Sequence, residues 1–272
     1  MTKRRRPPRT PAEFTDRYGP WAIVLGASEG LGAAFAGELA RRGLNLLLVA
    51  RRAEVLEEVA APLRSRVEVR CAALDLADAA LAERLASLTA DLDLGLCVYN
   101  AAYSRIGPFV DQSLADKERI LAVNCRGPLI AAHVFGPRMI ARGRGGLLLM
   151  SSLTAFWGAP WIATYGATKA FNLMLGEALW GELGARGVDV LSCCAGATRT
   201  PGFLRASAGG SAPRSMPAES VAAAALDRLG GGPSMIPGIP NRLAALALRI
   251  LPRRRAVTIL GDASAGLRDG DG

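Results

Sequence analysis

The stretch W-A-I-V-L-G-A-S-E-G-L-G-A-A-F-A-G-E-L-A-R-R, residues 21–42, decides the fold class of this chain. It joins five apolar residues to a glycine-rich turn and then to an amphipathic segment with helical spacing. Consecutive apolar residues are typical of a strand that is buried on both faces of a sheet. A strand that leads through a glycine turn into a helix begins a strand–helix–strand unit, so we expect a parallel sheet.

The rest of the chain repeats this alternation. Strand-like runs occur at 21–25, 44–49, 67–71, 94–99, 146–151, 188–193 and 234–237, and helical patterns lie near 30–42, 53–64, 78–90, 114–141, 161–185 and 218–229. The sequence therefore predicts an α/β fold in one domain, residues 19–240: a doubly wound parallel sheet of about seven strands with helices on both faces. A stretch rich in Gly, Ser, Ala and Pro predicts an irregular, mobile loop near 196–217.

The formal charge of +9 is concentrated at the two ends of the chain. Residues 1–11 and 241–255 each carry five basic side chains and no acidic one, which leaves the remainder nearly neutral. A nucleic-acid-binding face is therefore not expected. We expect a basic, disordered tail at 1–18 and an amphipathic basic helix with a tail at 241–272. A pocket cover or subunit contact is favoured for 241–255 over attachment to an anionic membrane, which stays open as the alternative.

Several other classes of protein are disfavoured by composition. No stretch provides the 18 or so apolar residues of a membrane-spanning helix. Five cysteines have no metal-like spacing, and a single histidine, His133, can build neither a Ser-His-Asp triad nor a histidine-rich metal site. Reduced thiols in a cytoplasmic protein without a metal are the expectation.

The glycine turn, with Gly26, Gly30 and Gly32, predicts a dinucleotide site, because glycines let a pyrophosphate approach the free N–H groups at the start of a helix. The second strand ends in Arg51 and Arg52, where a fold that selects NAD would place an acid. Arginine can pair with the 2′-phosphate of NADP, so NADPH is favoured over NADH, with Arg51 the preferred contact. The alternative is that both arginines are ordinary solvated charges.

Two polar residues follow later strands. Asp75, after the third strand, is positioned to accept from an adenine amino group, or else serves as a turn or helix-cap residue. Asn100 ends the fourth strand and is expected to lie under the cofactor at the carboxyl edge of the sheet.

The motif Y-G-A-T-K, residues 165–169, places a phenol and an amine on one face of a helix. An ammonium about 4 Å away, at an effective dielectric near 20, favours a phenolate by roughly 4 kcal/mol. We therefore expect Lys169 to lower the pKa of Tyr165 by up to about three units, before desolvation opposes it, and to make it a general acid. Ser152, at the end of the fifth strand, can bond the substrate oxygen. Asn124 can anchor a water that links the lysine to solvent.

These motifs, in this order, resemble the short-chain dehydrogenase/reductase family over roughly residues 19–240, and within it the branch of 3-oxoacyl reductases and 17β-hydroxysteroid dehydrogenases. The resemblance implies a Rossmann-type fold and a catalytic tetrad of Asn124, Ser152, Tyr165 and Lys169. It assigns the cofactor to Gly26, Ser28, Glu29, Gly30, Leu31, Gly32, Arg51, Arg52, Asp75, Leu76, Asn100, Ala101, Ala102, Tyr165, Lys169, Ala195, Gly196, Thr198 and Thr200, the last two at the nicotinamide carboxamide.

Three departures from the family pattern affect cofactor geometry. Leu25 replaces a threonine whose side chain would bond the Asn100 region, Ala102 replaces the glycine of Asn-Ala-Gly, and Ala195-Gly196 replaces Pro-Gly. None removes a group used in hydride transfer.

A substrate pocket is expected at Ser152, Trp157, Trp161, Phe203 and Leu204, although the two tryptophans could equally be core packing. The sequence thus predicts reversible, NADPH-dependent reduction of a hydrophobic ketone or aldehyde, such as a 3-oxoacyl thioester, a steroid or an aryl ketone. The alternatives are an NADP⁺-dependent alcohol dehydrogenase and a non-catalytic NADPH sensor or scaffold. Pairing of the helices near 114–141 and 161–185 into a homodimer or homotetramer is implied by the resemblance.

Overall fold

The computed structural model describes residues 6–206 and 215–265. Parts of the expected N-terminal tail (1–5), of the loop (207–214) and of the C-terminal tail (266–272) therefore lie outside the described residues.

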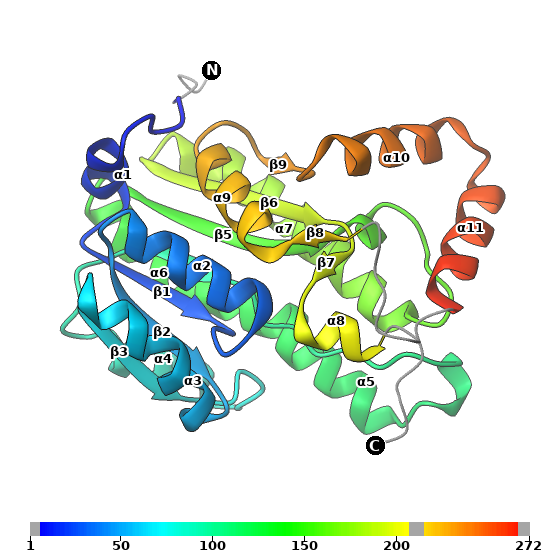
Figure 1. The fold of residues 1–272 in the computed structure, drawn as a ribbon, viewed down its shortest axis with the longest axis horizontal. Coiled ribbons are helices and arrows are strands. Elements are labelled where there is room, and N and C mark those ends of the chain that lie inside the picture. Colours follow the sequence, from blue (N-terminus) through cyan, green and yellow to red (C-terminus); the bar gives the residue numbers. More distant parts are fainter. Residues whose placement is uncertain (1–5, 207–214, 266–272) are drawn as a thin grey trace.

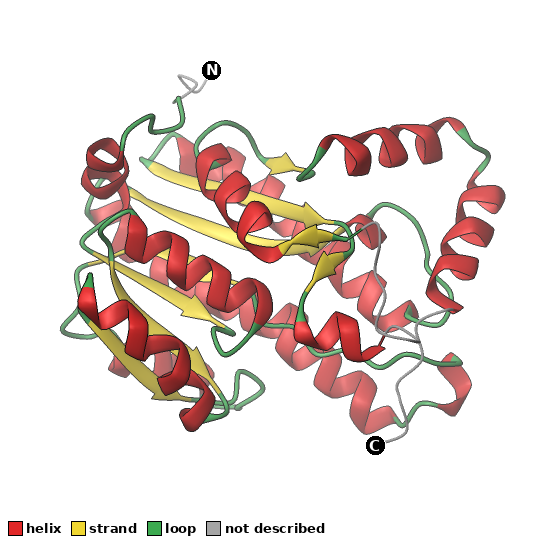
Figure 2. Cartoon of the chain, viewed as in Figure 1, coloured by secondary structure: helices red, strands yellow, loops and turns green. Residues whose placement is uncertain are grey.

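A parallel sheet of seven strands forms the centre of the molecule (Figures 1 and 2). Its order is β3-β2-β1-β4-β5-β6-β9, with every neighbouring pair parallel. The strands are β1 Trp21–Leu25, β2 Asn45–Ala50, β3 Val69–Ala73, β4 Leu94–Tyr99, β5 Gly145–Ser152, β6 Val188–Ala195 and β9 Ser234–Met235. The expected single-domain α/β fold is confirmed, and the reversal of strand order between β1 and β4 creates the crevice where this architecture binds ligands.

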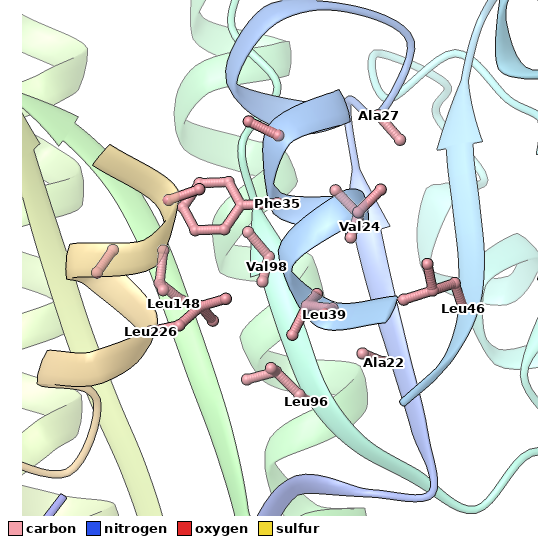
Figure 3. Close-up of a cluster of buried hydrophobic side chains, with 14 of the residues drawn as sticks. Ala22, Val24, Ala27, Phe35, Leu39, Leu46, Leu96, Val98, Leu148 and Leu226 are labelled. Atoms are coloured by element: carbon pink, nitrogen blue, oxygen red, sulfur yellow. The ribbon is translucent and has the colours of Figure 1, made fainter. Parts of the chain in front are cut away.

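Helices cover both faces of the sheet. One face carries α1 Pro11–Tyr18, α2 Gly30–Arg41, α3 Ala53–Ala60 and α9 Ala218–Arg228, and the other carries α4 Leu81–Leu88, α6 Gly127–Ala141 and α7 Ala163–Gly184. Successive residues of one strand enter opposite cores: Ala22 and Val24 pack under α2 (Figure 3), whereas Ile23 and Leu25 pack on the other side. This is why the strands read as uninterrupted apolar runs.

The shorter elements gather mainly around the carboxyl ends of the strands. They are α5 Leu114–Leu121, α8 Pro201–Ala206, and a small parallel pair of β7 Thr198–Arg199 with β8 Met216–Pro217. The expected irregular loop at 196–217 is thus wrong for these residues. Thr200 accepts a hydrogen bond from the Phe203 N–H (3.1 Å) as α8 begins with Pro201, a pairing that favours a helix start.

The expectation of a disordered tail is wrong for residues 11–18. Thr10 accepts a hydrogen bond from the Glu13 N–H (3.2 Å) and Pro11 opens the helix, which is a strong N-terminal signal. Phe14 and Tyr18, one turn apart, are buried, and the Tyr18 hydroxyl donates to Asp189 (2.8 Å). The basic composition of residues 1–11 favours a disordered tail, and this prediction gives no weight to the apolar pair Phe14 and Tyr18 that follows.

The C-terminal region also differs from the single helix expected at 241–255. It forms α10 Ile239–Ile250 and α11 Arg253–Ala265, because Pro252 cannot continue the helical hydrogen bonds of α10. Both helices extend beyond the edge of the sheet (Figure 1). Across the described residues, no helix has the length and apolar character needed to cross a bilayer.

Candidate active site

The glycine turn between β1 and α2 is held tightly. Gly26 and Gly30 have φ values of +89° and +57°, in the left-handed region that favours glycine. A Cβ on Gly32 would lie 1.9 Å from the carbonyl oxygen of Gly26, so no larger side chain fits without moving the backbone. The turn therefore brings the N-terminus of α2, the positive end of the helix dipole, to the edge of a cleft.

That cleft has a volume of about 310 Å³ and runs along the carboxyl ends of β1, β2, β3 and β4. Thirteen of the predicted cofactor residues line it: Gly26, Ser28, Glu29, Gly30, Leu31, Arg51, Arg52, Asp75, Leu76, Asn100, Ala101, Ala102 and Thr200. The lining also includes Ala50, Leu74, Tyr103, Arg119, Val123 and Gly202, which sequence reasoning missed. The residues fit an extended dinucleotide, with a glycine cradle at one wall and arginines at one end.

The departure at Leu25 is compensated by other hydrogen bonds. The Leu25 carbonyl accepts from the backbone N–H groups of Asn100 (2.9 Å) and Ala101 (2.8 Å). The Asn100 side chain donates to the Gly26 carbonyl (2.8 Å). The link between the glycine turn and the end of β4 therefore survives without a threonine.

Asp75 is engaged by the protein itself. Its Oδ1 accepts from the Ala77 N–H (2.9 Å), forming a local turn, and its Oδ2 pairs with Arg119 (2.6 Å). Partial desolvation opposes ionisation, but the Ala77 hydrogen bond and the Arg119 guanidinium outweigh it and lower the pKa of Asp75. Arg119 comes from α5, 44 residues along the chain, and no local pattern signals this contact.

The two arginines after β2 differ in their surroundings. Both are exposed at the mouth of the cleft. Arg52 lies 3.6 Å from the Glu29 carboxylate, whereas Arg51 forms no ion pair with any carboxylate in the described part of the chain. Arg51 is therefore the better placed of the two to meet an anion in the cleft.

Three residues of the expected tetrad, Ser152, Tyr165 and Lys169, come together at the end of β5. Tyr165 and Lys169 lie one turn apart on α7, with the ammonium nitrogen 5.4 Å from the centre of the tyrosine ring. Ser152 ends β5, and its hydroxyl is hydrogen-bonded to the Tyr165 hydroxyl. Lys169 is buried and donates to the Met150 carbonyl (3.0 Å). Neither Tyr165 nor Lys169 lines the 310 Å³ cleft itself.

The expected lowering of the tyrosine pKa is wrong in this structure. Burial raises the pKa of Tyr165 to about 12, against a smaller opposing effect of the Ser152 hydrogen bond. Burial also lowers the pKa of Lys169 to about 8. The sequence argument weighed the attraction between the two charges, but desolvation of the phenolate is the larger effect here because Lys169 is directed at the Met150 carbonyl.

Asn124 has a positioning role that sequence reasoning missed. It lies in a π-helical turn, Ala122–Arg126, between α5 and α6, and is fully buried. Its Oδ1 accepts from the Tyr103 N–H (2.8 Å), and its Nδ2 donates to the Tyr103 carbonyl (2.9 Å) and to the Thr168 hydroxyl (3.0 Å). Both side-chain donors are thus used to tie α7 to the loop after β4.

Comparisons with known proteins support this geometry. The family model for short chain dehydrogenases matches residues 20–208. The chain belongs to the short-chain dehydrogenase/reductase family. It is an oxidoreductase acting on CH–OH or C=O groups.

Two relatives illustrate the range of this family. A 7beta-hydroxysteroid dehydrogenase of Clostridium sardiniense is 37% identical over 194 residues, covering 71% of this chain and 74% of the relative. A very-long-chain 3-oxoacyl-CoA reductase of Podospora anserina is 38% identical over 181 residues, covering 64% of this chain. The match spans only 53% of that reductase.

Solved structures similar to this chain have the same fold. One from work on 7beta-hydroxysteroid dehydrogenase stereoselectivity has a TM-score of 0.85 at 30% identity, covering 91% of this chain and 98% of its own. A short-chain dehydrogenase from Sphingobium yanoikuyae in complex with NADPH has a TM-score of 0.75 at 30% identity, covering 89% and 95%.

The substrate side of this short-chain dehydrogenase is built from segments far apart in the chain. Trp157 is buried against Ala245 of α10 and Ala256 of α11, which favours the packing alternative for this residue. Trp161 is 41% exposed and has a φ of +70°, and its carbonyl accepts from the Gly107 N–H (2.8 Å). A left-handed conformation at a bulky residue is strained and holds the indole outward.

The remaining predicted residues are not part of the cleft lining. Phe203 and Leu204 are partly buried on α8, directly after Thr200. Gly32, Ala195, Gly196 and Thr198 do not line the cleft. The Thr198 hydroxyl donates to the Gly196 carbonyl (3.0 Å), and the Asn241 side chain of α10 packs directly on Gly196.

Proposed function

We propose that this short-chain dehydrogenase reduces a hydrophobic ketone or aldehyde to the alcohol with NADPH, reversibly. The observation that carries the proposal is the constellation of Tyr165, Lys169 and Ser152 at the carboxyl edge of the sheet, close to a cleft shaped for a dinucleotide. The reaction direction is proposed as reductive, and oxidation with NADP⁺ is the alternative within the same chemistry.

The roles of the residues follow from their positions. When bound, reduced nicotinamide supplies the hydride that adds to the carbonyl carbon. Tyr165 gives its proton to the carbonyl oxygen, and its raised pKa keeps that proton in place at neutral pH. Ser152 bonds the same oxygen and orients it between the two hydroxyls. Lys169 places a positive charge beside the ring, and Asn124 holds α7 in register with the loop at Tyr103.

NADPH rather than NADH is proposed from the end of β2. Arg51 and Arg52 stand at the mouth of the cleft, and Arg51 has no ion pair with a described carboxylate. A guanidinium there offers paired N–H donors to a 2′-phosphate. The Sphingobium relative, described in complex with NADPH, shows that this fold accepts the phosphorylated cofactor in a protein of 30% identity.

The substrate is proposed to be large and apolar. Trp161 is exposed on the segment leading to Tyr165, and Phe203 and Leu204 follow the cleft residue Thr200 on α8. The Clostridium relative named for a 7beta-hydroxysteroid aligns over 74% of its own length, against 53% for the Podospora relative named for 3-oxoacyl-CoA. An oxo-steroid is therefore placed first among the candidate substrates, ahead of 3-oxoacyl thioesters and aryl ketones.

The deciding experiment follows NADPH absorbance with a panel of oxo-steroids, 3-oxoacyl thioesters and aryl ketones, with NADH in parallel. The expected result is turnover with NADPH on at least one class, lost by about 10³-fold in Tyr165→Phe while NADPH affinity stays within about twofold. Tight NADPH binding with no turnover on the whole panel, unchanged in the variant, would instead favour the sensor alternative.

A homodimer or homotetramer is proposed through α5, α6 and α7. Large apolar side chains are exposed on these helices: Leu114 and Leu121 on α5, Leu129 on α6, and Phe171 and Met174 on α7. Exposed large apolar side chains of this kind are typical of a subunit contact. Light scattering after gel filtration should return two or four times the chain mass of 28.4 kDa, and a monomer would contradict the proposal.

A further inference from the structure

The outer face of α10 is apolar and exposed. Ile239, Leu243, Leu246 and Ile250 show 69%, 61%, 56% and 79% of their surfaces. Their spacing of four, three and four residues places them in one row along the helix. The opposite side of α10 packs through Ala245 and Leu248 onto the Trp157 cluster, so the helix is anchored with its apolar row pointing away from the body.

A row of positive charge accompanies the apolar row. Arg242 and Arg249, seven residues and therefore two turns apart, lie beside it on α10, and Arg253, Arg254 and Arg255 begin α11. All five are exposed, and none forms an ion pair with a carboxylate of the described residues. The sequence contains no acidic residue between Asp227 and Asp262.

The charge selects among possible occupants of this surface. A second copy docked symmetrically would bring the two sets of arginines against each other, at a cost in repulsion. An uncharged apolar partner would leave the arginines unused. An anionic bilayer accommodates both features, because the apolar row enters the acyl boundary while the guanidinium groups meet lipid phosphates.

We propose that α10, with the first turn of α11, is a docking surface for anionic lipid bilayers. The helix lies in the plane of the bilayer surface, with its apolar row inserted and its arginines at headgroup level. This reverses the preference drawn from the sequence, which favours a pocket cover or a subunit contact for 241–255 and keeps membrane attachment as the alternative. The structure instead leaves that row uncovered by the described residues.

The position of α10 gives the docking a consequence, which rests on the proposed function. Asn241 donates to the Pro237 carbonyl (2.9 Å) and to the Met216 sulfur (3.4 Å), and it packs on Gly196. The docked helix therefore adjoins the segment that carries Thr198 and Thr200. A hydrophobic carbonyl compound dissolved in the bilayer would reach the active site without crossing water.

The test is co-sedimentation of the full chain with vesicles, in the absence of substrate, so that its outcome is independent of the proposed reaction. Vesicles of phosphatidylcholine alone are compared with vesicles containing 30% phosphatidylglycerol as the probe composition. We expect binding to the anionic vesicles only, weakening at high salt. Arg242→Gln with Arg249→Gln should weaken it by about 25-fold, from about fivefold per arginine near such a surface. Leu243→Gln with Leu246→Gln should weaken it by at least tenfold.

Matched controls are Arg66→Gln and Leu88→Gln, which change exposed side chains far along the chain and should leave binding within about twofold. Circular dichroism and NADPH binding verify that each variant is folded. If the double leucine variant does not fold, the double arginine variant still tests the proposal, because both of its side chains are exposed. Absence of binding, equal binding to neutral vesicles, or binding unchanged in both double variants would overturn the proposal. So would a shift of the leucine variant to a smaller oligomer, since a second copy would then cover the face.

Discussion

The cofactor side and the substrate side of this molecule are assembled differently. On the cofactor side, the residues that shape the cleft follow β1, β2, β3 and β4 within a few positions, and hydrogen bonds between Leu25, Gly26 and Asn100 join neighbouring turns. On the substrate side, Trp157 packs on α10 and α11, and Asn241 packs on Gly196, so the contacts come from two helices that follow the last strand of the sheet. Most residues of the first side can be recognised from motifs that directly follow a strand, whereas those of the second side depend on how the C-terminal helices pack on the sheet.

The largest effect is expected at the tightest point of the cofactor side. Gly32→Ala places a Cβ 1.9 Å from the Gly26 carbonyl oxygen, so the turn must open. We expect NADPH affinity to fall by at least 100-fold in fluorescence titration. The matched control is Gly37→Ala on the same helix, where a Cβ meets nothing within 4 Å. That control should bind normally and gain about 0.5–1 kcal/mol of stability. Equal affinities for the two variants would contradict the account of the turn.

Lys169 is buried on α7, and replacing it measures how much a buried positive charge lowers the free energy of unfolding. Burial lowers the pKa of Lys169 from 10.5 to about 8, so below pH 8 the folded protein carries an ammonium that the unfolded chain would solvate better. At about 1.4 kcal/mol per pKa unit, Lys169→Met should raise the free energy of unfolding at pH 7 by about 3 kcal/mol, although turnover is lost. The gain should shrink as the pH rises from about 8 to about 10.5, because the native lysine then becomes neutral in both states. Urea unfolding of the native protein and of Lys169→Met at pH 7 and pH 10 measures this stability difference. A variant less stable than the native protein at both pH values would contradict a destabilising buried charge at Lys169.

Cofactor selectivity should depend on one arginine more than the other. Arg51→Gln removes a guanidinium that no described carboxylate pairs, and we expect NADPH affinity to fall by about 10- to 30-fold while NADH affinity stays within about twofold. Arg52→Gln removes the partner of Glu29 and should have the smaller effect. Parallel titrations of both variants with NADPH and NADH show which arginine contributes more to NADPH affinity. An equal loss of affinity for NADPH and NADH would exclude a contact with the 2′-phosphate.

The smallest effect is expected on the substrate side. Gly196→Ala places a Cβ 2.6 Å from the Asn241 side-chain oxygen, and we expect a loss of about 1–2 kcal/mol in thermal unfolding. Adding Asn241→Ala should recover much of the loss, because the clash is with a side chain and not with backbone. Gly181→Ala on α7, where a Cβ meets no described atom within 4 Å, is the control and should gain about 0.5–1 kcal/mol, as expected for Gly37→Ala. Failure of the double variant to recover would place the cost in the backbone at 196.

Much of the fold and of the site could be predicted from the sequence because its signals are local. The strands at 21–25 and 94–99 have the predicted bounds, since both faces of each are buried and the apolar run is continuous. Tyr165 and Lys169 meet because four residues make about one helical turn. The π-helical turn at Asn124, in contrast, leaves no periodic signal, so the segment 114–141 was expected to be an ordinary helix.

The sequence by itself determined the family, the parallel sheet and the glycine turn, because these are visible in apolar runs, glycine positions and helical spacing along short stretches of chain. Only the tertiary structure decided the partner of Asp75, the packing of Trp157, the order at 11–18 and the direction of the Tyr165 pKa shift. These depend on burial and on contacts between residues that are distant in sequence. Desolvation in particular is set by everything that surrounds a group, and no stretch of five residues contains that information.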